Sequence, residues 1–527
     1  MDKDTELNEF GINAAKSGGI FLSSNVISSI LILAMSVFVA RYLQPADFGL
    51  YTIVVAFSTF LSMGGNFGIG TAFRKYIPEN KKSDVLGNMI ASGYLISIAI
   101  SATITIIAIA ISPYIAATLY RNAALTLPLI IASITFLLSV MLNLNIAALV
   151  ALKKSKKTAY SIIGYSSMEM VAAIVLVYLG FGVLGAIAGI AIGTFIGLLV
   201  SFASLFEDLE LKTFKATKKM IGKLTSFSIP VVISYVFQNG IINFGILFLG
   251  IYASSFVLGN FGAAFRLGRF IEVLLASSTI VLLPTFAEAI TNGFSKDIGL
   301  IYNKSVYYTF LLILPIVAYI SATSVQISKL FFTSSYILTP FYLSFIVIGS
   351  TINIVGTYAG ILLLGYGKAK DFMKYQLIGI IVEILLLAYL VPQHTALGLL
   401  VAIFAIGPVL MGVLYTIVLR KDLSIRIEYG RIGKLVIAAV ISGFIILEAG
   451  GYINSAVFSL LKSSYLALIA VIVANIIIMA FLYPLFAAVL GAVRDRDLKF
   501  IKGVSGRIKI TEKPINLIIR YTKLFIR

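Results

Sequence analysis

The chain has 527 residues, 60% of them hydrophobic and 12% charged, and its mean hydropathy is +1.03. This balance excludes a soluble globular protein and is typical of a chain that crosses a membrane many times. The formal charge of +19 is spread through short loops, which argues against nucleic acid as a partner and favours membrane lipids with anionic headgroups.

Metal and redox chemistry have few residues to draw on. The chain contains no Cys and a single His, His394. Disulfides, thiolate metal sites and Cys nucleophiles are therefore excluded, and one His does not build a His-based metal centre. The sequence also has no phosphate-binding loop. We predict neither a metal nor a cofactor.

Apolar stretches long enough to cross about 30 Å of hydrocarbon as helices recur along nearly the whole chain. Their continuous runs, with Gly, Ala and Ser as packing residues, do not fit the short alternating strands of a membrane barrel. We therefore predict an all-α polytopic membrane protein with about fourteen transmembrane helices. The predicted spans are 20–40, 50–72, 88–111, 126–150, 160–180, 183–206, 227–250, 257–286, 302–325, 341–365, 375–391, 397–419, 435–455 and 465–490.

Basic residues occur at the N-terminus, in every second loop between these spans and throughout the C-terminal tail. The opposite set of loops holds only Arg41, Arg121, Lys329 and Lys462. Since Lys and Arg are retained on the cytoplasmic side, this asymmetry predicts that both termini are cytoplasmic, in a multi-pass protein of the cell membrane.

An internal repeat relates the two halves of the chain. The stretch YLQPADFGLY aligns with YASSFVLGNF, so that Gly49 meets Gly259. Further on, Lys154 aligns with Lys368 in nearly the same register, which also places Glu169 on Glu383. Two nearly equal offsets at corresponding helix junctions indicate a duplicated unit of six helices.

The repeat predicts a division of the chain into four parts. We expect an N-terminal six-helix lobe at 1–222, a C-terminal six-helix lobe at 223–434, two additional helices at 435–490 and a basic cytoplasmic tail at 491–527. Because six is even, both lobes start on the same side, so the repeat is parallel, about an axis along the membrane normal. Such a protein is expected to have a substrate path between its lobes and to work by alternating access.

Three stretches carry a resemblance to a known family: SGGIFLSSNVISSILILAMSVFVARYLQPADFGLY, GNFGIGTAFRKYIP and LGNFGAAFRLGRF. They resemble the polysaccharide-lipid flippases of the multidrug/oligosaccharidyl-lipid/polysaccharide (MOP) exporter superfamily, and R-Y-L-x-P-x-D-F-G-L-Y is the most specific piece. The resemblance extends over both predicted lobes. It implies a V-shaped pair of six-helix lobes that moves a lipid-linked oligosaccharide, carried on a polyprenyl phosphate or pyrophosphate, from the cytoplasmic leaflet to the outer one.

Two arginines inside the predicted span 257–286 are the leading candidates for binding such a substrate. Arg266 and Arg269 are three positions apart and share a helix face, so together they offer two cationic forks to one phosphate group. Intramembrane charge is expensive, which favours a function. The alternative is structural: Arg269 pairs with Glu272, and Arg266 extends its charged end to the membrane surface.

Other polar residues carry weaker indications. Asn25, Asn239 and Asn243 lie in predicted spans, where they suit either sugar hydroxyls or hydrogen bonds between helices. Arg74 lies at the cytoplasmic end of a span, where it attracts an entering headgroup or simply follows the positive-inside rule. Glu169 and Glu383 occupy equivalent positions, which fits either a shared structural task or, with Glu272, coupling to H⁺ or Na⁺.

Two further classes of function compete with the flippase. One is a cation-coupled drug or metabolite antiporter of the same superfamily, whose members typically carry an acidic residue in the first helix; residues 20–40 contain none. The other is a membrane enzyme acting on lipid carriers. Its acids and bases are expected in outer loops, but the loops around 112–125 and 326–340 contain no Asp, Glu or His. We therefore expect no enzyme.

The C-terminal end, PINLIIRYTKLFIR, interleaves Ile with basic residues such as Arg520 and Lys523. This pattern resembles an amphipathic helix that lies on an anionic leaflet. A solvated tail is the alternative.

Overall fold

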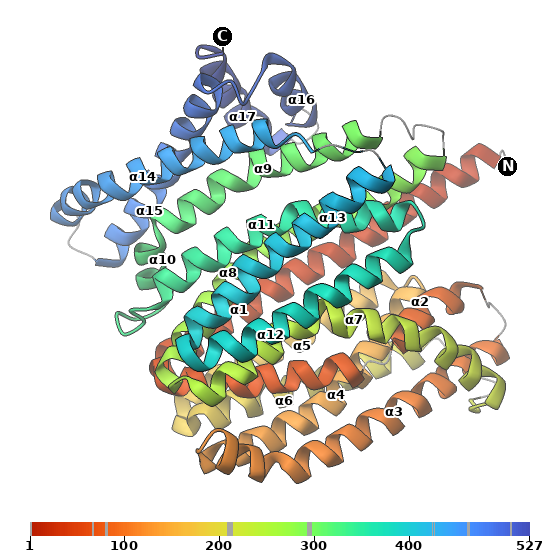
Figure 1. The fold of residues 1–527 in the computed structure, drawn as a ribbon. Coiled ribbons are helices and arrows are strands. Elements are labelled where there is room, and N and C mark those ends of the chain that lie inside the picture. Colours follow the sequence, from red (N-terminus) through yellow and green to blue (C-terminus); the bar gives the residue numbers. More distant parts are fainter. Residues whose placement is uncertain are drawn as a thin grey trace. The chain divides into compact units, whose positions relative to one another are not determined.

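The structure is a computed structural model. It describes residues 3–65, 68–79, 83–207, 214–291, 298–423, 425, 427–460, 464–505 and 509–526. Regular secondary structure in these ranges is entirely helical (Figure 1). The predicted all-α class is confirmed.

Contacts between Cα atoms divide the chain into two compact units, residues 1–262 and 263–527. The first unit contains α-helices, short irregular helical turns and the start of a helix that continues into the second unit. These are α1 (Lys3–Gly65), α2 (Ile69–Glu79), α3 (Ser83–Tyr114), η1 (Ile115–Leu119), η2 (Ala123–Leu125), α4 (Thr126–Ala151), α5 (Ser155–Leu176), η3 (Val177–Phe181), α6 (Gly182–Phe206), α7 (Lys218–Tyr252) and the first residues of α8 (Ser255–Thr291).

The second unit contains the rest of α8 and the helices that follow it. They are α9 (Ile298–Ala322), α10 (Ser324–Phe331), α11 (Thr339–Gly365), α12 (Ala369–Val401), η5 (Ala402–Ile406), α13 (Gly407–Leu423), α14 (Tyr429–Leu460), α15 (Ser464–Val489), α16 (Asp495–Ser505) and α17 (Lys509–Lys523). In this unit α9 packs against both α11 and α14, and α14 packs against α15 (Figure 1).

The described residues contain nine helical segments that are long and apolar enough to cross a membrane. Three of them, Gly19–Gly65, Ser155–Phe206 and Lys370–Lys421, are 47, 52 and 52 residues long, and each covers two predicted spans wholly or in large part. In each case a residue with non-helical φ and ψ angles separates the two spans: Gln44, Gly180 or Thr395. Together with α7 and α8, which hold the remaining two predicted spans, these segments agree with about fourteen crossings.

Glycines bring α5 and α6 into close contact. Gly185, Gly189, Gly193 and Gly197 recur at every fourth position of α6 and so share one face. A Cβ atom at Gly189 or Gly193 would collide with the backbone of α5, at Ala173 and at Glu169. Small residues at this spacing let helix backbones approach closely in membranes.

Equivalent turns recur in the backbone, as expected from the repeat. After α4, the Lys154 amide donates to the Leu149 carbonyl, and after α11 the Lys368 amide donates to Leu363, each bond 2.9 Å long. The residue before each lysine, Lys153 or Gly367, has a positive φ, 59° or 73°. The lobe boundaries stay a prediction: contacts divide the chain after residue 262, since α7 packs against α1.

The R-Y-L-x-P-x-D-F-G-L-Y stretch forms the sharp corner within α1. Gln44 takes φ 62° and ψ 171°, a conformation that interrupts the helix, and Pro45 has no N–H to continue the hydrogen-bond ladder. After the corner, a Cβ at Gly49 would collide with the carbonyl oxygen of Ser255, and one at Gly259 with the carbonyl oxygen of Pro45. The repeat aligns Pro45 with Ser255 and Gly49 with Gly259. Equivalent residues of the two repeats therefore make this contact with each other, in a reciprocal way.

Candidate functional site

Arg266, Arg269 and Glu272 lie on α8, as predicted. Arg266 lies about three turns after the start of the helix at Ser255, which places it about 16 Å along the helix axis. The three side chains differ in exposure: Arg269 is exposed, whereas Arg266 and Glu272 are half-buried. The arginines therefore share a helix but not an environment.

Arg266 lies close to the segment between α10 and α11. Its Nη1 atom is buried, and its charge acts on Tyr336 of that segment. Burial raises the pKa of the Tyr336 phenol, and the Arg266 charge opposes this rise. Slightly further along α8, Gly268 faces Ile346 of α11 so closely that a Cβ there would lie 2.6 Å from the Ile346 side chain. Arg266 thus belongs to a packed region within the second unit.

Arg269 and Glu272 interact through their charges. This pairing is the structural alternative that the sequence left open for Arg269. An exposed Arg beside a half-buried carboxylate still has donors for a second acceptor, since a guanidinium carries five N–H groups. Pairing with Glu272 and binding of a phosphate are therefore compatible.

The other polar candidates of the first unit lie on three helices. Asn25 is exposed on α1 and donates from its amide to the Phe21 carbonyl, 2.8 Å away in the same helix. Asn243 is half-buried on α7, whereas the Asn239 side chain lies outside the described residues. Arg74 is exposed on α2, next to the buried Phe73 and one turn before the buried Ile77.

Glu169 and Glu383 occupy equivalent contacts between helices. Glu169 of α5 is 8% exposed, accepts a hydrogen bond of 3.5 Å from the Thr194 hydroxyl and packs against Gly193 of α6. Glu383 of α12 places a carboxylate oxygen against Gly407 at the start of α13. Gly407 follows Glu383 at the same sequence separation as Gly193 follows Glu169. Both carboxylates thus lie within a repeat, at the contact between one helix and the next.

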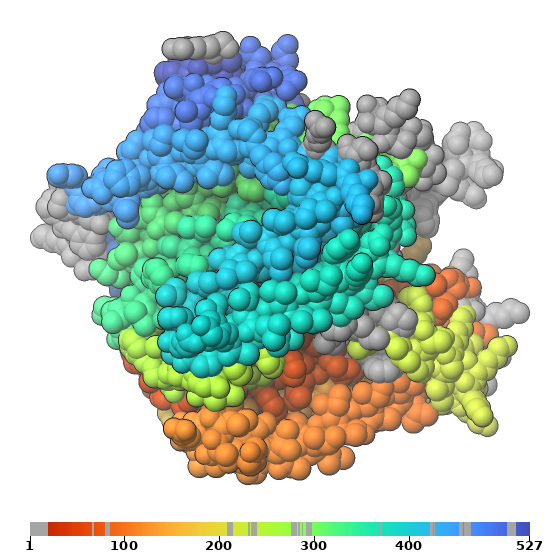
Figure 2. Space-filling model, viewed as in Figure 1, coloured from red at the N-terminus to blue at the C-terminus, as the bar shows by residue number. Residues whose placement is uncertain are grey.

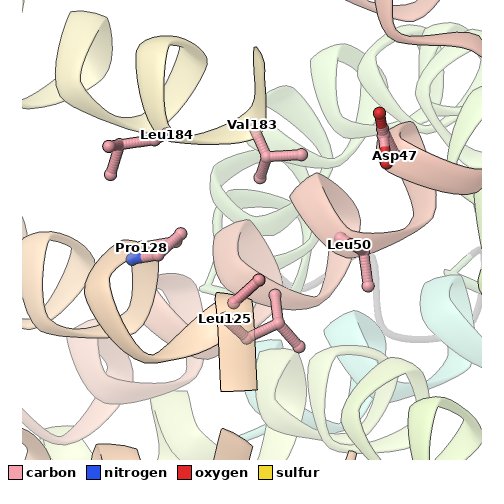
Figure 3. Close-up of a pocket in the computed structure, with 7 residues that line it drawn as sticks. Asp47, Leu50, Leu125, Pro128, Val183 and Leu184 are labelled. Atoms are coloured by element: carbon pink, nitrogen blue, oxygen red, sulfur yellow. The ribbon is translucent and has the colours of Figure 1, made fainter. Parts of the chain in front are cut away.

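A pocket of about 260 Å³ opens at the corner of α1 (Figure 3). It is lined by Asp47, Leu50, Ala124, Leu125, Pro128, Val183 and Leu184. Its charged group is a carboxylate, which repels an anion. This pocket therefore does not suit a phosphate headgroup. Among the residues that the structure describes, no group of three or more His, Cys, Asp or Glu side chains is arranged to hold a metal ion.

Sequence reasoning missed one polar cluster, at the junction of α9, α14 and α16. Arg431 Nη2 lies 2.6 Å from Asp497 Oδ2, and Asp497 is 2% exposed. From the sequence pattern Arg431 is one of many loop charges, and nothing singles out Asp497. The available signal was weak: an acidic residue in the first turn of a short helix inside a basic tail.

Comparisons with known proteins identify similar families and folds. Residues 14–290 match the model of a family described as polysaccharide biosynthesis protein. The structure is similar to the lipid II flippase MurJ in an inward closed conformation, with a TM-score of 0.69 and 15% identity over 88% of this chain and 98% of that one. It is also similar to a multidrug resistance MATE family transporter of the MOP superfamily in an inward-facing conformation, with a TM-score of 0.62 and 17% identity over 77% of this chain and 98% of that one. Comparison with curated proteins gave no match.

Proposed function

Because the chain belongs to the polysaccharide biosynthesis protein family, whose model it matches over residues 14–290, we propose that it is a lipid-linked oligosaccharide flippase of the MOP superfamily. The proposed reaction moves a polyprenyl phosphate or pyrophosphate that bears an oligosaccharide from the inner to the outer leaflet, for surface polysaccharide or glycoprotein assembly. The observation that carries the proposal is the pair of arginines within α8, in a fold similar to that of a lipid flippase.

The substrate class follows from the charge of these residues. A phosphate-linked headgroup has to pass a region of low dielectric, where an unpaired charge is strongly disfavoured. Guanidinium groups stay protonated and donate two parallel hydrogen bonds to phosphate oxygens. Arg266 and Arg269 are the proposed headgroup ligands, and Asn25, Asn239 and Asn243 are proposed contacts for sugar hydroxyls.

The proposed cycle is alternating access between the two repeats. With both termini cytoplasmic, Arg74 attracts the headgroup at the inner surface, and the arginines of α8 bind it in an inward-open cavity. Rocking of the lobes then exposes the headgroup outward, while the lipid tail stays in the bilayer. Glu169, Glu383 and Glu272 are the candidates for coupling this cycle to H⁺ or Na⁺, since carboxylates are the acidic groups that such coupling uses.

A cation-coupled antiporter of drugs or metabolites is the second candidate. Its support is the similarity in fold to the MATE family transporter. The two candidates differ in what accumulates when the protein is depleted. Mass spectrometry of lipid-linked saccharides is expected to show a complete lipid-linked saccharide building up, with loss of the matching surface glycan. Unchanged glycans together with new drug sensitivity would favour the antiporter.

The proposed site is tested by replacing both arginines. Arg266→Gln/Arg269→Gln is expected to abolish translocation of the accumulated saccharide, since each removes a charge-assisted ligand. Arg266→Lys/Arg269→Lys keeps the charge but loses the fork, so its activity should be intermediate. The matched control is Arg494→Gln/Arg496→Gln, which removes the same charge from exposed residues of the tail. Full transport by the first variant, at normal expression, would overturn the site but leave the flippase assignment standing.

A further inference from the structure

The C-terminal tail begins where a membrane-spanning helix ends. The apolar span of α15 runs to Val489, Gly491 turns the chain with a φ of 66°, and α16 starts at Asp495. Figure 2 shows the described part of the tail, in dark blue, on the surface of the molecule. The tail thus starts at the edge of the hydrocarbon region.

A buried ion pair holds α16 against the rest of the second unit. The Asp497 carboxylate lies 2.6 Å from the Arg431 guanidinium. It accepts one hydrogen bond of 2.9 Å from the backbone amide of Arg494 and another of 3.2 Å from the Tyr308 hydroxyl. The Phe500 ring stacks on Tyr308 with centroids 4.3 Å apart. The tail is therefore a packed element of the unit, which fixes the position of the helix that follows.

The next helix, α17, lies alongside α15. The ring of Tyr521 meets that of Phe481 edge-on, with centroids 5.2 Å apart. Phe481 lies about two turns before the end of α15 at Val489, which corresponds to about 12 Å along the helix axis. Because α17 contacts α15 about 12 Å inside the end of this span, α17 lies at the level of the lipid headgroups and the adjoining acyl chains.

Two opposite faces of α17 have different surroundings. Ile519 and Thr522 are buried, at 6% and 2% exposure, on the side toward the core. The other side carries an outer stripe of four exposed residues, three on α17 and a fourth, Leu524, in the turn directly after the helix ends at Lys523. Leu517 is 58% and Leu524 is 77% exposed. The spacing of three and four positions puts the three helical residues on one face. The outer stripe consists of Lys513, Leu517, Arg520 and Leu524.

We propose that the outer stripe binds the anionic headgroups of the cytoplasmic leaflet, with its leucines in the acyl region and its cations at the phosphates. Large leucines that alternate with cations are too apolar for a solvated face and suit the boundary between hydrocarbon and water. Anionic lipid is the occupant because the stripe holds Lys and Arg and no acid, and because α17 lies beside a span. This site is separate from the proposed transport site and does not depend on the proposed function.

The absence of Cys allows a single reporter. We would label Leu517→Cys in the full chain with a polarity-sensitive fluorophore and reconstitute it in lipid nanodiscs. Every set contains the same fraction of a nitroxide-labelled lipid; in one set the remaining lipid is phosphatidylcholine alone, and the others contain rising fractions of phosphatidylglycerol. As the anionic fraction rises, we expect the fluorophore to report a more apolar environment and its fluorescence to be quenched by the nitroxide. Lys513→Gln/Arg520→Gln should weaken the binding of anionic lipid to the outer stripe roughly 25-fold, at about fivefold per cation, and so remove most of that dependence.

The matched control is Lys370→Gln/Lys374→Gln. It removes the same charge from exposed residues one turn apart on α12, and it should leave the signal unchanged. A fluorophore that reports a polar environment and stays unquenched in anionic discs would overturn the proposal and favour a protein as the partner of the outer stripe. Quenching in neutral discs, or of the Lys513→Gln/Arg520→Gln variant in anionic discs, that is as strong as with the intact cations in anionic discs would overturn the assignment to anionic headgroups.

Discussion

At the scale of single residues, burial decides what an ion pair contributes. The Arg431–Asp497 pair and the Lys157–Glu207 pair have nearly the same distance, 2.6 and 2.7 Å, but Asp497 is 2% and Glu207 68% exposed. Removing one partner of a buried pair leaves an uncompensated charge, whereas an exposed pair is screened by water.

Asp497→Asn should therefore lower the free energy of unfolding by about 3–5 kcal/mol, and Glu207→Gln by at most about 1 kcal/mol. The measurement is thermal or denaturant unfolding of the purified protein in detergent. Equal losses of unfolding free energy for the two variants would contradict the inference that the Arg431–Asp497 ion pair holds the tail against the second unit.

The sequence identified Arg266, Arg269 and Glu272 as the charges of α8, because charged residues are conspicuous in an apolar run. It did not distinguish their environments. The neighbours of Arg266 come from a later segment of the chain, at Tyr336, and local patterns carry no information on such distant pairings. The partner of Arg269 lies one turn away on the same helix, and this interaction was predictable from helix geometry.

At the scale of elements, apolar length and turn residues predicted most of the helices. The spans in α3, α4, α11 and α15 agree with the structure, because each is a single continuous apolar run. Short helices such as α10 and α16, with 8 and 11 residues, were missed. Their existence depends on docking against neighbours, since isolated helices of this length are marginal.

The contact between α12 and α13 gives a sharp test of the Glu383 site. A Cβ at Gly407 would collide with the Glu383 carboxylate, whereas one at Gly412 of the same helix meets no atom within 4 Å. Gly407→Ala should destabilise the protein by about 1–3 kcal/mol, as overpacking does. Gly412→Ala should be neutral or stabilising by up to about 1 kcal/mol.

Unfolding measurements on the two glycine variants separate packing from helix propensity. If Glu383 also contributes to ion coupling, Gly407→Ala is expected to reduce coupled transport in the fraction that remains folded. Equal stability of both variants would show that the Glu383 carboxylate moves aside without loss of folding free energy, and would contradict a tight contact between Glu383 and Gly407.

At the scale of the whole molecule, the two fold comparisons differ in coverage. The match to the flippase MurJ covers 88% of this chain and the match to the MATE family transporter 77%. The difference is close to the share of the chain that α14 and α15 occupy, with 32 and 26 residues. The position of two helices outside a pair of six-helix repeats stays a prediction, because sequence periodicity alone set no firm boundary for them.

Alternating access makes a prediction about the contact between the repeats at the α1 corner. Thr52 and Gly262 are equivalent in the register that aligns Gly49 with Gly259, and a Cβ built on Gly262 lies 3.1 Å from the Thr52 Cβ. Disulfides have Cβ atoms about 3.8 Å apart, so Thr52→Cys/Gly262→Cys should cross-link after a small adjustment. If the lobes separate here during the cycle, oxidation should stop transport and a reductant should restore it.

The control for this cross-link lies within one predicted lobe. A Cβ on Gly70 of α2 lies 3.2 Å from the Ala147 Cβ of α4, so Gly70→Cys/Ala147→Cys should form a disulfide of similar geometry between helices that the proposed cycle moves together. Since the chain has no other Cys, each variant forms one defined bond. Arrest by the first cross-link and not by the second is expected from lobe rocking. Full transport by the oxidised Thr52/Gly262 variant would instead mean that this contact stays closed throughout, as a pivot about which the repeats turn.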